Sequence, residues 1–186
     1  MHTVSEYPSG SSEDRKMLET IPKSKLLDLL FLQIRNLWRV DGLYFLGIEK
    51  KFGSEIAAEI DASVWEMMAA IEAKGLQKTL QTPKKPKIAQ IIDLLRKSSW
   101  ALDQPFKTIE IDDKRAVLWI MRCRTQETRL NKDLMEFPCK NVRLGYLKNF
   151  ARTLNPEARV NCLVCPPDKH PRDSWCKWEF KLQKTL

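Results

Sequence analysis

Long apolar runs, histidine and glycine-rich loops are all scarce in this chain of 186 residues. No stretch approaches the ~18 to 20 apolar residues that a membrane-spanning helix needs, and no basic start followed by an apolar run marks a secretory signal. None of the six glycines belongs to a phosphate-cradling loop, and the motifs G-x-S-x-G and H-E-x-x-H are absent. We therefore expect a cytoplasmic protein with no membrane segment and no signature of a nucleotide-binding, serine-hydrolase or zinc-protease site.

Cysteine is missing from the first 122 residues and then occurs five times in the last 64. Four of these cysteines form one pattern, Cys139, Cys162-x2-Cys165 and Cys176. Zinc binds tetrahedrally through deprotonated sulfur, and a two-residue gap lets two thiolates hold one ion from a single turn. The Pro-Pro-Asp sequence after this pair predicts a rigid turn, from which the chain can return antiparallel. A reducing compartment favours metal ligation over disulfides, so we predict a structural zinc on these four residues.

Other interpretations of the cysteines stay open. Buried free cysteines commonly fill small core positions, and the pattern Cys162-x2-Cys165-x4-His170-x5-Cys176 falls one residue short of a zinc knuckle that binds single-stranded nucleic acid. A knuckle usually needs glycines in its tight loop, where this chain has prolines and lysines. A Cys–His nucleophile pair would have to use His170 with Cys123 or Cys176, and nothing in the spacing holds such a pair together. A shell of four thiolates would be closed to metal catalysis.

The charge is basic and unevenly distributed, with 32 Lys and Arg against 24 Asp and Glu and a net charge of +8. Residues 140–186 hold ten basic and four acidic residues and so supply +6 of that total. A basic patch can bind nucleic acid, but four thiolates around Zn²⁺ carry a net negative charge that nearby cations would stabilise. Moderate positive charge is also common on solvated surfaces. The charge does not decide the function, and we consider nucleic acid the less favoured partner.

The first 22 residues are polar, with proline, glycine and consecutive small residues, and they predict a flexible tail before a single domain over residues 23–186. Apolar residues at helical spacing follow, with Gly53 and Gly75 as expected stops and a polar linker at residues 77–87. The predicted helices cover residues 26–38, 43–52, 54–75 and 88–102.

The periodicity then changes from 3.6 to 2 residues, which predicts strands. The predicted strands cover residues 106–111, 115–124, 160–164 and 176–182, with an amphipathic helix at residues 140–153 between the second and the third. We therefore expect an α+β fold, with N-terminal helices packed on a C-terminal antiparallel sheet and one further helix. There are no internal repeats.

Alternation within residues 115–124 puts Val117, Trp119, Met121 and Cys123 on one face, which we assign to the core. The arginines that flank Cys123 then point to the opposite face. A thiol in an apolar wall keeps its proton, so we predict that Cys123 is inert.

The segment from Arg35 to Gly42 places charged groups among core-like residues. An exposed Arg39–Asp41 ion pair is one interpretation, and a pocket lined by Arg35, Arg39 or Asp41 is the other. Small-ligand sites are mostly apolar cavities with a few polar groups, and several bulky aromatic residues lie in phase with the buried face of their own element. The predicted pocket residues are Trp38, Arg39, Tyr44, Trp119, Cys123 and Phe150.

The cysteines also carry a resemblance to a known family. Together with the sequence Cys176-Lys-Trp-Glu-Phe, they resemble the C-terminal signature of 4-vinyl reductase domains, which are small-molecule-binding modules of bacterial aromatic sensors and archaeal proteins. A zinc site in that superfamily uses one Cys, then a Cys or Glu shortly before a second Cys, and a last Cys that opens the final strand. Cys139, Cys162, Cys165 and Cys176 match these positions in order. The gap between Cys165 and Cys176 is longer here, which leaves His170 open as a replacement ligand.

The layout from about Arg35 to Phe180 also resembles an uncharacterised family named for its similarity to L-2-amino-thiazoline-4-carboxylate hydrolase, through the motifs RNLWRVDGLYFLGIE, CPPD and CKWEF. The resemblances imply the fold and the zinc but not the reaction, because one scaffold of this kind binds varied ligands. We expect a small-molecule-binding, sensor-type domain with a structural zinc, which forms a homodimer through its N-terminal helices. The alternatives are a hydrolase of small cyclic amides or thiazolines and a zinc-knuckle-like nucleic-acid binder.

Overall fold

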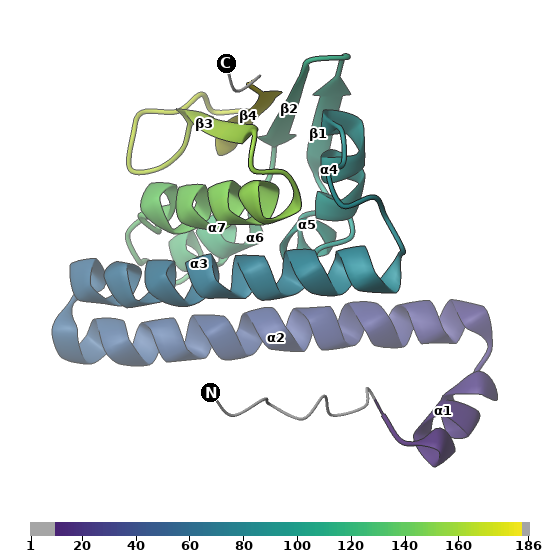
Figure 1. Ribbon diagram of the computed structural model, residues 1–186. Coiled ribbons are helices and arrows are strands. Elements are labelled where there is room, and N and C mark those ends of the chain that lie inside the picture. The colour runs from purple at the N-terminus through teal and green to yellow at the C-terminus, as the bar shows by residue number, and fades with distance from the viewer. Residues whose placement is uncertain (1–9, 184–186) are drawn as a thin grey trace, which may run out of the picture.

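The computed structural model describes residues 10–183 and has an α+β fold in which the helices pack against an antiparallel sheet (Figure 1). The fold class predicted from the sequence is confirmed. In chain order the elements are α1 (Ser12–Glu19), α2 (Lys23–Phe52), α3 (Ser54–Thr79), α4 (Ile88–Leu95), α5 (Ser99–Asp103), β1 (Lys107–Ile111), β2 (Arg115–Ile120), α6 (Arg124–Leu130), α7 (Cys139–Leu154), β3 (Ala158–Val164) and β4 (Cys176–Leu182). None of these helices is long and apolar enough to cross a membrane.

A short helix, α1, lies inside the segment that the sequence predicts to be a tail. Ser11 begins it, because its hydroxyl accepts a hydrogen bond from the Asp14 amide at 3.0 Å and its own amide donates to the Asp14 carboxylate at 3.2 Å. This capping box satisfies two backbone donors at the start of the helix. No residue of α1 is buried. The rest of the predicted tail at residues 1–9 lies outside the described part of the chain.

Two long helices, α2 and α3, form an antiparallel hairpin along one side of the molecule (Figure 1). α2 runs unbroken through Gly42, where the sequence predicts a junction, because a single glycine costs a helix only about 1 kcal/mol. Gly53 ends it with φ of 86°, as predicted. Gly75 does not end α3, which continues to Thr79. Trp38 stacks on Trp65 with ring centroids 4.5 Å apart and so fixes the register of the hairpin.

The core lies between α3, α7 and the sheet. α3 presents alanines to α7, and this lets the two helices approach closely; Ala69 and Ala73 are fully buried. On α7, Tyr146 and Phe150 are fully buried, and the Tyr146 hydroxyl donates to the Glu72 carboxylate at 2.7 Å. The helix predicted over residues 88–102 is divided into α4 and α5, because the Ser98 side chain caps a new helix.

The sheet has the order β1-β2-β4-β3, with every neighbouring pair antiparallel. Its most deeply buried positions on β2 are Ala116, Leu118 and Ile120, so the face assigned to the core from the sequence is wrong. Trp119 lies on the other face, where the Lys177 ammonium sits 3.7 Å from its ring centroid. β2 also ends at Ile120, and Cys123 lies outside it at the N-cap of α6.

Candidate functional site

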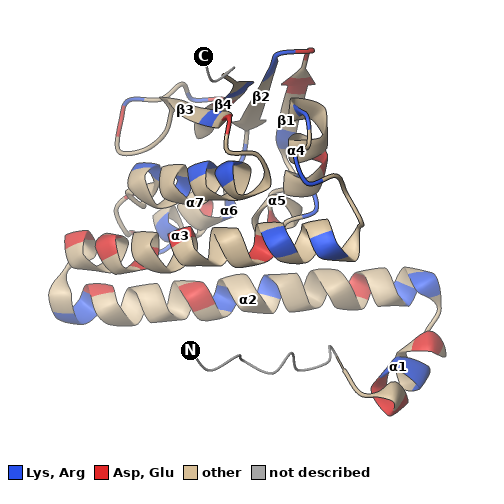
Figure 2. Cartoon of the chain, in the orientation of Figure 1, with Lys and Arg blue, Asp and Glu red and all other residues tan. Residues whose placement is uncertain are grey.

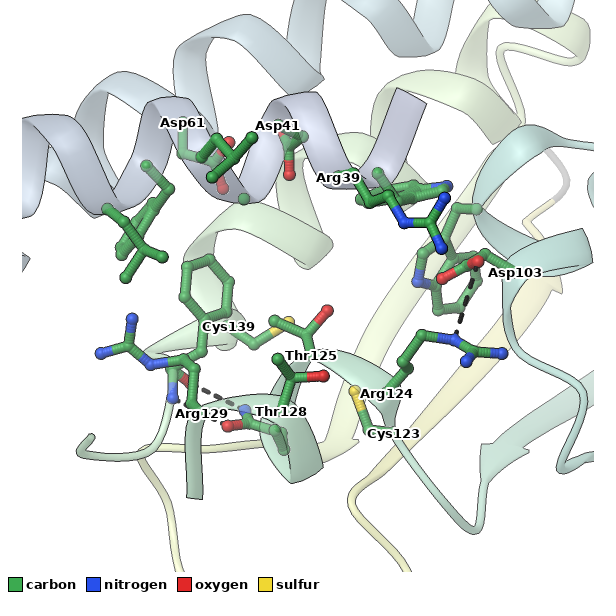
Figure 3. Close-up of a pocket in the computed structure, with 18 of the residues that line it drawn as sticks. Arg39, Asp41, Asp61, Asp103, Cys123, Arg124, Thr125, Thr128, Arg129 and Cys139 are labelled. Carbon is green, nitrogen blue, oxygen red and sulfur yellow. Dashed lines mark hydrogen bonds and ion pairs between the residues drawn. The ribbon is translucent and has the colours of Figure 1, made fainter. Parts of the chain in front are cut away.

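A pocket of about 570 Å³ lies between α2, α6 and the first turns of α7 (Figure 3). α3 and α5 complete its wall with Asp61, Trp100 and Asp103. Of the pocket residues predicted from the sequence, three line it: Trp38, Arg39 and Cys123. The other three are absent from its wall: Tyr44, Trp119 and Phe150.

Each of the three aromatic residues outside the pocket has a different environment. Tyr44 is 72% exposed on α2, and Trp119 packs under Lys177 on the sheet. Phe150 is fully buried beside Tyr146, with ring centroids 6.0 Å apart. The expectation that aromatic residues from both halves share one cavity is therefore wrong. Helical or strand phase shows which side of an element is apolar, but it does not show whether that side meets a cavity, a packed core or solvent.

Arg143 on α7 is a pocket residue that the sequence analysis missed. It lines the pocket and is only 5% exposed. Its guanidinium carbon lies 4.7 to 5.7 Å from the centroids of four aromatic rings: Trp38, Trp65, Trp100 and Tyr146. Its Nε and Nη1 atoms have no hydrogen-bond partner among the described residues. One feature of the sequence could have identified it. Arg143 is in helical phase with Tyr146 and Phe150, which puts a charged residue on the apolar side of its helix.

Two aspartates line the pocket side by side, Asp41 from α2 and Asp61 from α3 (Figure 3). The positive charge of Arg143 acts on both of them. A hydrogen bond joins their side chains, and the Trp65 indole donates to Asp41 at 2.9 Å. Burial and the charge of Asp41 raise the pKa of Asp61 to about 7, although Arg143 opposes the shift. The pair therefore holds a proton near neutral pH, on Asp61, which donates to Asp41.

The predicted surface ion pair between Arg39 and Asp41 does not form. Asp41 pairs with Asp61 and Trp65, and the Arg39 guanidinium donates to Asn36 at 2.9 Å. Arg39 and Asp41 both line the pocket instead, which is the alternative interpretation of that segment.

The pocket wall has an excess of positive charge, with six basic side chains against three acidic ones. Arg35 forms an ion pair with the buried Asp103, and Arg124 lies 3.9 Å from the same carboxylate. Burial, together with the charges of Arg124 and Arg39, lowers the pKa of Arg35 to about 10. Because cations crowd this wall, an anion inside the pocket would be electrostatically favoured.

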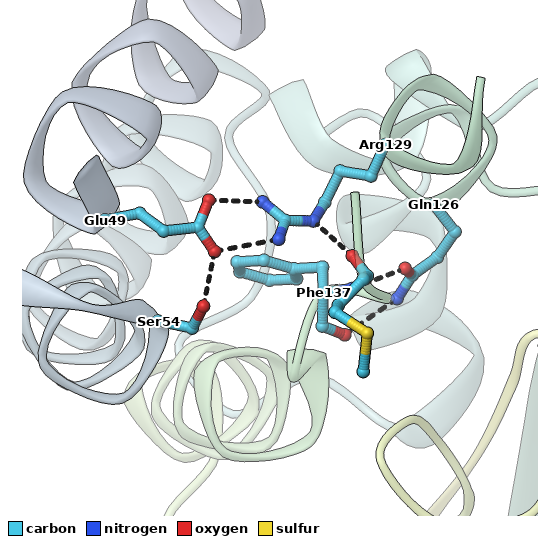
Figure 4. Close-up of polar contacts among 6 residues, drawn as sticks. Glu49, Ser54, Gln126, Arg129 and Phe137 are labelled. Carbon is cyan, nitrogen blue, oxygen red and sulfur yellow. Dashed lines mark hydrogen bonds and ion pairs between the residues drawn. The ribbon is translucent and has the colours of Figure 1, made fainter. Parts of the chain in front are cut away.

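Polar contacts hold α6 and the segment after it against the α2–α3 turn (Figure 4). The Arg129 guanidinium donates two hydrogen bonds to the Glu49 carboxylate, at 2.8 and 2.9 Å, and a third to the Met135 carbonyl at 2.7 Å. The Gln126 side chain donates to the Phe137 carbonyl and accepts from its amide. A bidentate ion pair of this kind fixes orientation as well as distance. The contacts therefore make this side of the pocket a preformed wall.

Cys123 lies at the pocket wall, and its burial, together with the nearby thiol of Cys139, raises its pKa to about 12. The thiolate population at neutral pH is then about a thousandfold below that of an ordinary thiol. We predict that iodoacetamide at pH 7.5 leaves Cys123 unmodified in the folded protein, while the denatured protein is labelled there within minutes. Peptide mass spectrometry measures both. Rapid labelling of Cys123 in the folded protein would contradict the prediction and would favour a nucleophilic cysteine.

The four cysteines of the predicted zinc site come from separate elements. Cys139 opens α7, Cys162 lies near the end of β3, Cys165 follows that strand, and Cys176 opens β4. A backbone hydrogen bond of 2.9 Å from Lys140 to the Pro166 carbonyl ties the start of α7 to the turn after β3. All five cysteines of the chain are unpaired.

Cys165 is the centre of this cysteine group, because its side chain hydrogen-bonds those of both Cys139 and Cys176. The hydrogen bond from Cys165 lowers the pKa of Cys139 to about 7, with a further contribution from Arg143, and the same contacts raise the pKa of Cys165. Burial raises the pKa of Cys162 to about 11. The donor set, four soft sulfur ligands, has the chemistry that zinc prefers.

The four cysteine side chains do not complete a metal site in this structure. Across residues 10–183, no group of three or more His, Cys, Asp or Glu side chains has an arrangement that could hold a metal ion. The Cys139–Cys165–Cys176 contacts are hydrogen bonds between neighbouring thiols, and zinc would have to replace their protons and draw in Cys162. His170 contacts the Pro171 carbonyl at 3.0 Å and Glu136 at 3.5 Å. Zinc ligation by the four cysteines therefore stays a prediction.

Comparison with known proteins supplies a family but no activity. No curated protein matches the chain. Residues 19–182 match the sequence model of a family of unknown function, DUF6125. The matched segment extends from the last residue of α1 to the end of β4 and includes every pocket residue and all five cysteines. The resemblances to 4-vinyl reductase domains and to the thiazoline hydrolase stay predictions. Since the match covers most of the sequence, from the first long helix to the last strand, the chain belongs to the DUF6125 family.

Proposed function

We propose that this protein binds a small anionic molecule, a carboxylate with an apolar body, in the pocket between α2, α6 and α7. The observation that carries this proposal is the state of Arg143. It is buried and surrounded by aromatic rings, it lines the pocket, and two of its nitrogen atoms lack a protein partner.

Unpaired buried donors are costly, at about 1 to 3 kcal/mol for each group. The four aromatic rings hold the guanidinium in place, since a cation over a ring face is stabilised by up to about 2 kcal/mol when desolvated. Rings accept no proton from Nε and Nη1 in a conventional hydrogen bond, so these atoms remain free to bind a ligand. A carboxylate suits this arginine because its charge complements the guanidinium and its oxygens accept charge-assisted hydrogen bonds. Nε and Nη1 point to different sides of the guanidinium, so each would donate its own hydrogen bond.

The remainder of the pocket suits an apolar ligand body. Its volume of about 570 Å³ lies within the range of about 300 to 1,000 Å³ that is usual for small-molecule sites. Phe45, Phe137 and Trp100 line it, and the first two contact each other edge to face at 4.8 Å. The combination of apolar walls with an excess of cations favours an organic anion over a neutral or cationic molecule.

A titration with benzoate and its neutral isostere benzamide tests this proposal. Trp38, Trp65 and Trp100 surround Arg143, so tryptophan fluorescence reports binding there. We expect saturable binding of benzoate at least about tenfold tighter than that of benzamide, which corresponds to one charge-assisted hydrogen bond. Equal affinities, or no binding of either molecule, would contradict the proposal.

A hydrolase is the second candidate function, and the Asp41–Asp61 pair favours it. A carboxyl group whose pKa lies near 7 can serve as a general acid or base at neutral pH. Cys123 does not support a thiol nucleophile, because burial keeps it protonated. If there is a reaction, it would therefore use proton transfer by the aspartates and not attack by Cys123.

We also propose one structural zinc on Cys139, Cys162, Cys165 and Cys176. The proposal is supported by the type of the four donors and by the contacts of Cys165 with Cys139 and Cys176. Bound zinc would supply a crosslink between α7 and the β3–β4 hairpin. Because Cys139 and Arg143 lie on consecutive turns of α7, that crosslink would also hold the guanidinium at the pocket.

The protein is proposed to work in the cytoplasm, since five unpaired cysteines suit a reducing compartment. Nucleic acid is less favoured as a partner. Several of the C-terminal basic residues that suggested it already have protein partners, for Lys140 pairs with Asp168, Lys181 with Glu179, and Lys177 with the Trp119 ring.

A homodimer is proposed through the outer face of the α2–α3 hairpin. From residue 29 to residue 48 the only charged residues of α2 are Arg35, Arg39 and Asp41, and all three line the pocket. The middle of α2 is therefore mostly tan in Figure 2. Exposed apolar side chains occur along both helices of the hairpin. Together they form the hairpin face: Leu30, Leu37, Val40, Tyr44, Ile56, Ile60, Val64, Met67 and Ile71.

The size of the hairpin face fits a second copy of the chain. The Trp38–Trp65 stack sets Leu37 level with Val64 and Met67, so the two rows run side by side. The nine side chains are about half exposed and leave roughly 500 Å² of apolar surface for each chain. A standard interface buries about 800 Å² per partner, about 65% of it apolar in homodimers. A two-helix layer is also self-complementary across a twofold axis.

We predict that Val64→Glu converts the dimer to a monomer, because it places a charge at the centre of the hairpin face. Size-exclusion chromatography with light scattering at micromolar concentration measures the change. Ile111→Glu is the matched control: Ile111 has a similar exposure, 46% against 49%, but lies on β1. It should leave the dimer intact. A monomeric unmodified protein, or a dimer that survives Val64→Glu, would contradict the proposal.

A further inference from the structure

The Asp41–Asp61 pair gives the pocket a second kind of polar group, opposite the basic one. Both side chains line the pocket, they are hydrogen-bonded to each other, and Asp41 is held in place by the Trp65 indole at 2.9 Å. Two carboxylates close enough to hydrogen-bond repel each other strongly unless they share a proton. The protein therefore maintains a protonatable pair at the wall of this pocket.

Paired acids alone do not identify a ligand site, but Arg143 provides an independent observation. It is 95% buried, it faces the same pocket, and its Nε and Nη1 atoms lack partners. Arg143 also lowers the pKa of both aspartates through its positive charge. An anion that binds Arg143 would neutralise that charge and add a negative charge near the pair. Both changes act on the proton of Asp61 in the same direction.

We propose that Asp41 and Asp61 form the proton-exchanging end of the pocket, so that an anion bound at Arg143 draws a proton from solvent onto the pair. This inference rests on the proposed function and adds proton linkage to it. The proton comes from water or buffer and goes to a carboxylate oxygen of Asp61. The expected ligand class is an organic anion whose affinity depends on pH. A second polar group on that ligand can accept a hydrogen bond from the protonated Asp61 carboxyl.

The sign of the coupling follows from the charges. Below pH 7 the pair holds one proton and carries one negative charge, and above pH 7 it carries two. The second charge repels a bound anion, so affinity should be higher at pH 6 than at pH 8. The expected change is about tenfold for each unit by which the anion raises the pKa of the pair. Benzoate itself does not titrate in this window.

Isothermal titration calorimetry with benzoate measures the proton directly. Binding is recorded at pH 7 in several buffers of different ionisation enthalpy, and the slope of observed enthalpy against that enthalpy gives the number of protons taken up. We expect uptake of up to about half a proton per benzoate, because the free pair is about half protonated at that pH.

Substitutions at the aspartates test whether the proton taken up on benzoate binding goes to the Asp41–Asp61 pair. Asp61→Asn keeps a hydrogen-bond donor to Asp41 and removes the titration, so benzoate should bind without proton uptake and without pH dependence between pH 6 and 8. Cys139 also faces the pair from α7. Uptake that persists in Asp61→Asn would assign the proton to a group other than Asp61 and overturn the inference. Glu59→Gln, an exposed change on the same helix, should leave uptake intact.

A stability measurement supports the assignment without any ligand. The pKa of Asp61 is higher in the folded state than in the unfolded chain, so the folded state holds a proton that the unfolded state releases. Stability should therefore fall as pH rises from about 4 to 7, and Asp61→Asn should flatten this slope. An unchanged slope in the folded variant would contradict the inference.

The outcomes separate the two proposals. No benzoate binding by the unmodified protein would refute the proposed function, and this inference with it. Benzoate binding with no proton uptake would refute this inference alone. Should Asp61→Asn fail to fold, Asp41→Asn removes the same like-charge pair and is expected to lower the pKa of Asp61, which reduces proton uptake at pH 7. Burial of Asp61 remains in this variant, so the expected result is a reduction; unchanged uptake would contradict the inference.

Discussion

Replacing Cys165 by serine is expected to remove the bound zinc and to destabilise the protein by more than about 4 kcal/mol. Cys165 is fully buried and hydrogen-bonds both Cys139 and Cys176, so no other side chain can take its place. A structural zinc site contributes its binding free energy to folding, and the loss of one ligand weakens the site severely. Elemental analysis should give one zinc per chain for the unmodified protein and none for Cys165→Ser, with a lower melting temperature.

The matched control is Cys123→Ser, which changes a partly buried cysteine outside the predicted ligand set. It should keep one zinc per chain and lose far less stability. A simple core role for the cysteines makes a different prediction, since Cys165→Ser would then cost about 1 to 3 kcal/mol for an unpaired hydroxyl and no metal would be found. A folded, metal-free protein would contradict the zinc proposal.

The second large effect is expected for Arg143→Met, which should weaken benzoate binding by at least about thirtyfold, or about 2 kcal/mol, and abolish the preference over benzamide. Methionine keeps much of the apolar volume among the aromatic rings but removes the charge and the two free donors. Arg152→Met is the matched control, because Arg152 is exposed on the same helix. It should bind benzoate normally.

Arg143→Met also removes the cation that faces the Asp41–Asp61 pair, so we expect the variant to be less stable. Arg143→Lys keeps the charge and loses the planar fork, and it should give an intermediate loss of benzoate affinity. Unchanged binding in both variants would show that the pocket does not use Arg143.

Much of the fold was predictable because its strongest local signals agree with its tertiary contacts. Gly53 ends α2 in the left-handed conformation that few other residues adopt. The alternation of apolar residues over residues 176–182 predicts a strand, and β4 forms there with Trp178 and Phe180 fully buried. The grouping of Cys139 with Cys165 and Cys176 also followed from spacing, although these residues come from different elements.

The pocket was less predictable, because its residues meet only through tertiary packing. In the sequence, Asp61 has the pattern of an ordinary polar residue on α3. Only the packing of α3 on α2 places it beside Asp41. The core face of β2 was predicted wrongly because Arg122 falls in the same alternating set as Ala116, Leu118 and Ile120. The other set, at the odd-numbered positions from residue 117 to residue 123, contains only apolar residues. The chain in fact leaves the sheet after Ile120, and Arg122 pairs with Glu127 outside it. Local periodicity therefore fixed neither the face of the strand nor its end.

The measurement that tests the central claim most directly is the NMR signal of the Arg143 Nε–H group during titration with benzoate. Arg143→Met assigns the signal by its disappearance. Benzoate should shift it in a saturable way, with the same affinity that tryptophan fluorescence reports, because the carboxylate accepts a hydrogen bond from that atom; benzamide at equal concentration should leave it nearly unchanged. If benzoate saturates the protein and the Arg143 signal does not move, then the anion binds elsewhere and the pocket is not organised around Arg143.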